Sequence, residues 1–200
     1  EGMKRITEPV DILDRDAFEK ELNELGALRA KADAIRTRLA KSINTKYQEN
    51  PAYYENFSKR IKEALELYKA RTITEAEYLA KMRDILEDYR TGKSAIAYPD
   101  RIRANVHAQA FYGVLTAIFS NEKLSVEPDF AAEMALDITT IIEKHSQVDW
   151  THNLTIHDRI SQDIDDLFYR YQKERGLVLS FDVIDMIIEN VKTVALRRVA

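Results

Sequence analysis

The chain has 200 residues, of which 45% are hydrophobic and 32% are charged, a composition typical of a soluble globular protein with a substantial core. It contains no cysteine, which excludes disulfides and thiolate metal sites, and it has no stretch that resembles a signal peptide or a membrane span. Its net charge of −4 does not favour DNA as a partner, and a cytoplasmic location is the expectation.

Apolar residues recur at helical spacing through most of the chain, and glycine and proline are few. No stretch alternates with a period of two, so the predicted fold class is all-α, a multi-helix bundle of long helices with an N-terminal helical arm. In chain order the predicted helices are a segment at about 27–48 (Leu28, Ala32, Ile35, Leu39, Ile43), then Phe57 to Tyr68, Leu79 to Tyr89, Ile102 to Ile118, Ala131 to Ile142, Ile160 to Tyr171 and Phe181 to Ala195.

Several local signals predict where these helices begin and end. A cap residue followed by proline or by an acid three positions later starts a helix, and glycine ends one. The predicted starts are Asn50 before Pro51, the Thr74 to Glu77 capping box, Asp100 after Pro99, Pro128 and Ser180, and the predicted ends lie near Gly26, Gly92 and Gly176.

Gly26 divides the chain into two expected parts. Residues 1–26 are expected to be a linker or short helix that continues from a longer parent protein, and residues 27–200 to form one C-terminal helical domain. The narrow apolar stripe at about 27–48 suggests an arm that packs on a partner or on the parent.

The same segment concentrates positive charge against a single acid, Asp33. A solvated helix face is the simpler interpretation, and contact with phosphates or with an acidic partner is the alternative. The cations are Arg29, Lys31, Arg36, Arg38, Lys41 and Lys46.

Motifs for several reaction classes are missing from the sequence. Gly92-Lys-Ser lacks the upstream glycine of a phosphate-binding loop, and no acid is followed by the D/E-x-K triplet of a Mg²⁺-dependent nuclease. Neither paired Glu-x-x-His motifs nor a nucleophile elbow is present. No catalytic, cofactor-binding or metal-ligating residue is therefore predicted.

The stretch HSQVDWTHN, from His145 to Asn153, is the chemically richest part of the chain. His145, Asp149, His152 and His157 are possible zinc ligands, but the five-residue spacing of the last two points them to different helix faces. The favoured interpretation is a corner between two long helices, with Trp150 as a buried anchor. The expected caps are Asp149, Thr151 or Asn153, with a further capping box from Thr155 to Asp158.

Around these residues the chain resembles the C-terminal helical domain of type I restriction enzyme R subunits, the motor subunits. Individually the matching blocks are weak, but they occur in order and at the family's spacing from about residue 30 onward. They are Asn50-Pro-Ala-Tyr-Tyr-Glu-Asn-Phe-Ser58, Arg71-Thr-Ile-Thr-Glu-Ala-Glu-Tyr-Leu79, Ala108-Gln-Ala-Phe-Tyr-Gly113, the run from Asp137 to Trp150, which ends in Val-Asp-Trp, and the tail from Leu179 to Glu189. The signature side chains are Tyr54, Phe57, Tyr78, Phe111, Tyr112, Asp149 and Trp150.

The resemblance implies a parent that is an ATP-dependent type I site-specific deoxyribonuclease using ATP and Mg²⁺, with these residues themselves not catalytic. The domain would dock the translocase and endonuclease onto the methyltransferase (M) and specificity (S) subunits, and would meet duplex DNA only through the parent complex. Two alternatives remain open: a helical module that contacts the DNA backbone through the cations of residues 29–46, and a free-standing metal-dependent enzyme built on the histidines.

Overall fold

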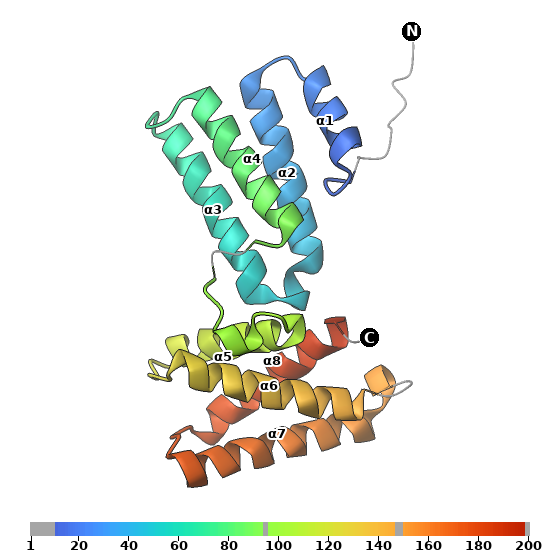
Figure 1. Cartoon of the computed structure of the whole chain (residues 1–200), viewed down its shortest axis with the longest axis vertical. Helices are drawn as coiled ribbons and strands as arrows, with labels where there is room; N and C mark the ends of the chain where they lie inside the picture. The colour runs from blue at the N-terminus through green and yellow to red at the C-terminus, as the bar shows by residue number, and fades with distance from the viewer. Residues whose placement is uncertain (1–10, 94–95, 147–149, 199–200) are drawn as a thin grey trace. The chain divides into compact units, whose positions relative to one another are not determined.

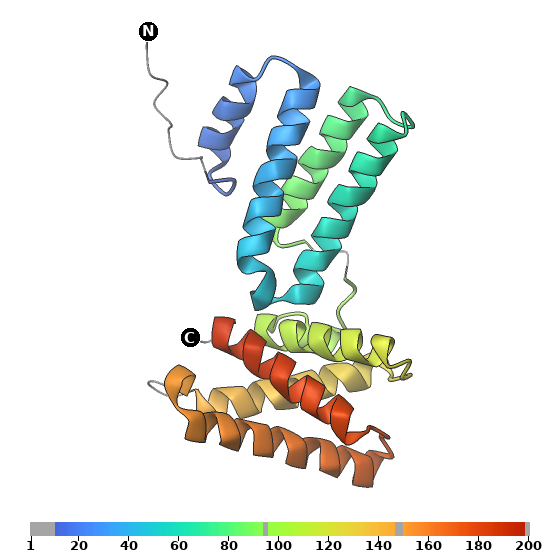
Figure 2. The same ribbon diagram turned by 180° about the vertical axis from the view of Figure 1, so that it is seen from behind.

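The computed structural model describes residues 11–93, 96–146 and 150–198, and these residues form eight α-helices, three short 3-10 helices and no strand (Figures 1 and 2). The prediction of an all-α fold is confirmed. Among the described helices, none combines the length and apolar character that a membrane span requires.

The chain divides into two compact units. Unit 1 takes residues up to 45 together with 56–95, and unit 2 takes 46–55 together with everything from 96 onward. Gly26, where the sequence suggested a division, lies within unit 1.

Unit 1 is built from four helices whose apolar faces turn inward. Phe18 and Leu22 of the first helix and Phe57 of the third are fully buried. The helices are α1 (Arg15–Glu24), α2 (Leu28–Lys46), the part of α3 (Pro51–Lys69) that follows residue 55, and α4 (Glu75–Thr91).

The apolar stripe of α2 is filled by unit 1 itself. Ala32, Ile35, Leu39 and Ile43 are almost completely buried, whereas Leu28 at the helix start is 43% exposed. A hydrogen bond of 2.6 Å between the Ser42 and Tyr89 hydroxyls joins α2 to α4. The stripe is therefore not available to a partner, contrary to the expectation for an arm.

Helix α4 has the ends that its sequence predicts. The Thr74 hydroxyl accepts the N–H of Glu77 at 3.2 Å, and the Glu77 carboxylate accepts the N–H of Thr74 at 2.7 Å, so the capping box is confirmed. Gly92 closes the helix in the left-handed conformation, with φ of 70°, which glycine adopts without the penalty of a Cβ.

Unit 2 is a closed arrangement of four helices. Each packs on the next, and α8 returns against α5. They are α5 (Val106–Asn121), α6 (Pro128–His145), α7 (Leu154–Arg175) and α8 (Phe181–Arg198), with the 3-10 helices η1 (Tyr47–Glu49), η2 (Asp100–Ile102) and η3 (Trp150–His152) beside them.

Three predicted positions in unit 2 are wrong. Asp100 begins only the 3-10 helix η2, and α5 starts at Val106 because the Asn105 side chain accepts the N–H groups of His107 and Ala108. Val106, which the helical spacing between Ile102 and Ile118 places on the apolar face, is 56% exposed. Phe181 was also placed in an apolar stripe, but it begins α8 and is 84% exposed.

Most residues of helix α5 are buried, and a segment from far earlier in the chain covers part of it. A Cβ built on Gly113 would lie 2.7 Å from the Cβ of Ala52, in the first turn of α3. The guanidinium of Arg198, at the end of α8, donates to the carbonyls of Glu49 and Val106 at 3.0 Å each. Residues 46–55 are thus an integral part of unit 2.

Candidate functional site

The described residues of the stretch from His145 to Asn153 lie between the end of α6 and the start of α7, where a corner is predicted. Trp150 is 4% exposed within the core of unit 2. Asn153 caps α7 by accepting the N–H of Ile156 at 3.3 Å, and its own N–H donates to the Trp150 carbonyl at 3.1 Å. The capping box predicted at Thr155 is wrong, because α7 has already begun at Leu154. Asp149 lies outside the described residues.

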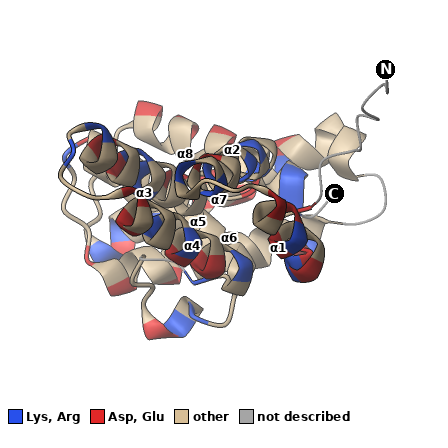
Figure 3. Ribbon diagram, turned by 90° about the horizontal axis from the view of Figure 1, so that it is seen from above, with Lys and Arg blue, Asp and Glu red and all other residues tan. Residues whose placement is uncertain are grey.

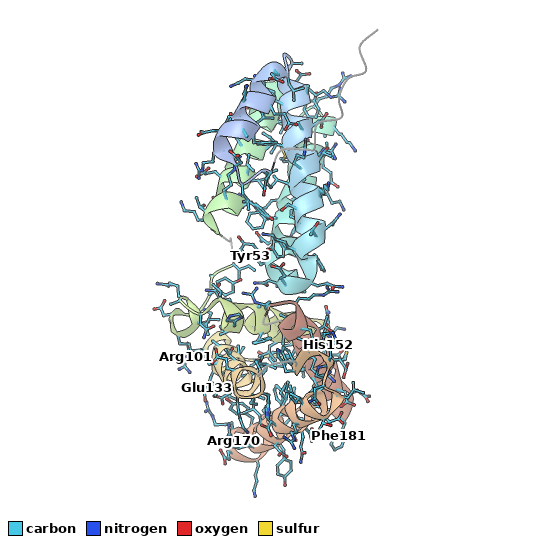
Figure 4. All side chains as sticks on the ribbon, turned by 90° about the vertical axis from the view of Figure 1, so that its right-hand side faces the viewer. Tyr53, Arg101, Glu133, His152, Arg170 and Phe181 are labelled. Carbon is cyan, nitrogen blue, oxygen red and sulfur yellow. The ribbon has the colours of Figure 1, made fainter. Side chains whose placement is uncertain are left out.

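The histidines near this corner bond to different partners. The Nε2 of His145 lies 2.8 Å from an Asp163 oxygen, and the Nδ1 of His152 lies 2.9 Å from the hydroxyl of Thr151. The Nε2 of His157 lies 3.0 Å from the Trp150 carbonyl, which only accepts, so this nitrogen carries a proton. Among the described residues, no group of three or more His, Cys, Asp or Glu side chains could hold a metal ion. His152 itself is exposed (Figure 4).

Asp163 joins the end of α6 to α7. One of its carboxylate oxygens accepts from Lys144 Nζ at 2.9 Å and lies 2.8 Å from His145 Nε2. The hydrogen bond from Lys144, followed by that from His145, holds the pKa of Asp163 below its ordinary value. The sequence shows Asp163 only as one acid in a run, because its partners lie on another helix.

We expect Asp163→Asn to lower the unfolding midpoint at neutral pH and to have progressively less effect in acid. Because the folded-state pKa is lowered, the carboxylate contributes stability above its unfolded-state pKa, and this contribution is lost as the pH falls through the folded-state value. Thermal unfolding followed by circular dichroism from neutral pH down to about pH 2 would measure the difference. Asp165→Asn, an exposed change on the same helix, is the control. An equal fall of the unfolding midpoint in both variants at all pH values would contradict the stabilising role of the Asp163 carboxylate.

Three of the six cations predicted on α2 are paired with carboxylates. Asp33 lies 3.6 Å from Arg29 and 3.4 Å from Arg36, and Glu21 of α1 lies 2.8 Å from Arg38. Figure 3 shows acids interspersed with lysines and arginines along the helices. Among the described residues, no carboxylate lies within 4.0 Å of the remaining cations, Lys31, Lys41 and Lys46.

The described signature side chains lie in the interiors of the two units. Tyr78 is fully buried and stacks on Tyr68 with ring centroids 4.8 Å apart, and Phe57 meets Tyr89 edge-on at 5.5 Å. In unit 2, Phe111 is fully buried. Tyr54 is 9% exposed and Tyr112 is 7% exposed. Since these rings are largely buried, they do not make a common exposed surface.

Unit 2 also contains a network of charged side chains that the sequence does not predict. Glu133 of α6 accepts from Arg101 of η2 at 3.4 Å and from Arg175 of α7 at 3.1 Å (Figure 4). The Tyr171 hydroxyl donates to Asp137 at 2.7 Å, and Arg170 lies 3.4 Å from the same carboxylate. These contacts tie helices together rather than presenting reactive groups, and no periodicity in the sequence signals them.

Comparison with known proteins gives one family. Residues 3–195 match the family described as Type I restriction enzyme HindI endonuclease subunit-like, C-terminal. Neither the curated proteins nor the solved structures gave a match to the chain.

Proposed function

The chain belongs to the type I restriction enzyme HindI endonuclease subunit-like C-terminal family, and from this membership we propose that it is an assembly domain. It docks the ATP-dependent translocase and endonuclease of an R subunit onto the core of methyltransferase and specificity subunits. The observation that carries the proposal is the family match, which runs through both units. In this proposal, the ATP and Mg²⁺ chemistry resides in parts of the parent other than these residues.

The charge arrangement favours assembly over DNA contact as the main role. Arg29, Arg36 and Arg38 are already engaged by carboxylates, so transferring them to phosphates would require breaking ion pairs within unit 1. A net charge of −4 adds a general repulsion from nucleic acid. A helical surface that meets another protein requires neither excess positive charge nor a reactive centre.

The direct test is binding of the chain to the purified core of its cognate M and S subunits. We expect a saturable complex, and we expect the chain to compete with the full R subunit for the same core. Circular dichroism would verify that the chain is folded during the measurement. A folded chain that neither binds the core nor displaces the R subunit would contradict the proposal.

A second candidate function, contact with the DNA backbone, rests on Lys31, Lys41 and Lys46. If each contacts a phosphate, changing all three to glutamine will weaken duplex binding and reduce the slope of log affinity against log salt by about 0.9 per contact. The matched control changes Lys59, Lys69 and Lys81, which are exposed cations elsewhere in unit 1. Equal effects of the two triple variants would mean nonspecific attraction and would remove this candidate.

A further inference from the structure

One end of unit 2 exposes large apolar side chains beside each other in the sequence. Val178, in the connection between α7 and α8, is 81% exposed, and Phe181, the first residue of α8, is 84% exposed (Figure 4). Single exposed apolar residues are common on protein surfaces, but a group of them next to a hollow is typical of a binding surface. We call Val178 and Phe181, together with the hollow that Val178 helps to line, the apolar end.

The hollow lies between two loops and has a volume of about 400 Å³. Its lining comes from the segment 124–127, from Phe130, and from residues 175–179. Most of these side chains are apolar, with Leu124, Val126, Leu177 and Val178 among them. A hollow of this size and composition accommodates apolar side chains of a bound segment.

Its walls are fixed by contacts within unit 2. Phe130 meets Tyr171 edge-on with ring centroids 5.1 Å apart, and the guanidinium of Arg175 lies 4.6 Å from the Phe130 ring centroid. Arg175 is also paired with Glu133 at 3.1 Å. Gly176 ends α7 in the left-handed conformation, with φ of 66°. The hollow is therefore preorganised, and its arginine is already neutralised.

The surrounding charge identifies the kind of occupant. From Gly176 to Val191 the chain contains acids but no lysine or arginine, and Glu127 adds a carboxylate to the lining of the hollow. Among the described residues, no cation lies within 4.0 Å of Asp182 or Asp185. The macrodipole of α8 gives Asp182 a structural reason to occupy the first turn, but Asp185 lies one turn beyond it.

This combination selects among the possible occupants. Acidic side chains repel DNA phosphates and anionic lipid headgroups. A second copy presenting the same end would bring like charges together. A protein segment with an apolar side chain flanked by lysine or arginine complements both the hollow and the carboxylates.

We propose that the apolar end of unit 2 is a docking surface for a basic, apolar protein segment. The proposal adds a binding surface to the assembly function. It rests on that function only in placing the segment in the core of M and S subunits. Phe181 and Val178 supply the apolar contact, and Asp182 and Asp185 select the positive charge.

The first test compares Val178→Ser/Phe181→Ser with the unaltered chain for binding to the M and S core. Both side chains are exposed, so the double variant is expected to fold normally, as circular dichroism would verify. We expect at least about a 30-fold loss of affinity, as for central residues of an interface. The control is Leu154→Ser/Tyr169→Ser, which removes side chains that are 75% and 64% exposed on α7 and should change affinity less than about 2-fold.

A second test does not depend on the assembly function. An amphipathic helical peptide made of leucine and lysine should shift the NMR methyl signals of Val178 and Leu177, and Asp182→Lys/Asp185→Lys should abolish this effect. A leucine and glutamate peptide of the same pattern should leave the signals unchanged.

The outcomes separate the two proposals. Core binding by the unaltered chain that persists in Val178→Ser/Phe181→Ser would overturn the docking surface while leaving the assembly function intact. Failure of the unaltered chain to bind the core, with the leucine and lysine peptide still bound at Val178, would overturn the assembly function alone. Equal shifts of the methyl signals with both peptides would overturn the proposal of a basic partner. A dimer of the unaltered chain that Val178→Ser/Phe181→Ser converts to a monomer would overturn it as well.

Discussion

Replacing Trp150 with alanine is expected to lower the free energy of unfolding of unit 2 by about 3–5 kcal/mol, the usual cost of truncating a large buried aromatic side chain. The indole is 4% exposed and lies in the core of unit 2. Its backbone carbonyl also receives the N–H of Asn153, the cap of α7, and lies 3.0 Å from His157 Nε2. Loss of the indole therefore removes core packing at the point where α7 is positioned.

The measurement is chemical denaturation followed by circular dichroism, because the substitution removes the only tryptophan and with it the tryptophan fluorescence. Two transitions should be fitted if the units unfold separately. His152→Ala, an exposed change in the same 3-10 helix, is the control and should cost less than about 0.5 kcal/mol. Adding a chelator should leave both midpoints unchanged; a chelator-induced loss of stability would instead assign a metal to the corner.

Gly113→Ala is expected to destabilise unit 2 by about 1–3 kcal/mol, the usual cost of overpacking a close contact. Helix propensity alone gives the opposite sign, since alanine is favoured over glycine inside a helix by about 1 kcal/mol. The added Cβ would lie 2.7 Å from the Cβ of Ala52, closer than two carbon atoms can pack. The steric effect should therefore outweigh the propensity.

A compensating substitution tests this explanation. Ala52→Gly combined with Gly113→Ala removes one methyl group and adds the other, so the double variant should be more stable than Gly113→Ala alone. Gly26→Ala is the control, because a Cβ there meets nothing within 4 Å. A stabilised Gly113→Ala would indicate that α3 and α5 separate at no cost.

Much of the fold could be predicted because its signals are local. The stripe of α2 and the caps of α4 depend on residues three or four positions apart, and both appear where the sequence places them. The errors at Asp100 and Thr155 have a shared cause. In each case an asparagine, Asn105 or Asn153, supplies a competing cap to a helix that begins elsewhere.

The candidate site was less predictable because its contacts join distant residues. The corner at Trp150 follows from two adjacent helix patterns, but the pairing of His145 with Asp163 depends on how α6 packs against α7. Likewise, the charge run of α2 gives no indication that Glu21 neutralises Arg38. Phe181 fits an apolar stripe by spacing, yet its position at the first residue of α8 takes it beyond the core.

The contacts of Arg198 with Glu49 and Val106 have a consequence for synthesis on the ribosome. Translation proceeds from the N-terminus, so residues 46–55 emerge well before α5 and long before α8. Unit 2 must therefore wait for the end of α8 before these contacts form. A nascent chain stopped before α8 would expose the flank of α5 that this helix covers, and chaperones that recognise apolar segments would be expected to bind there.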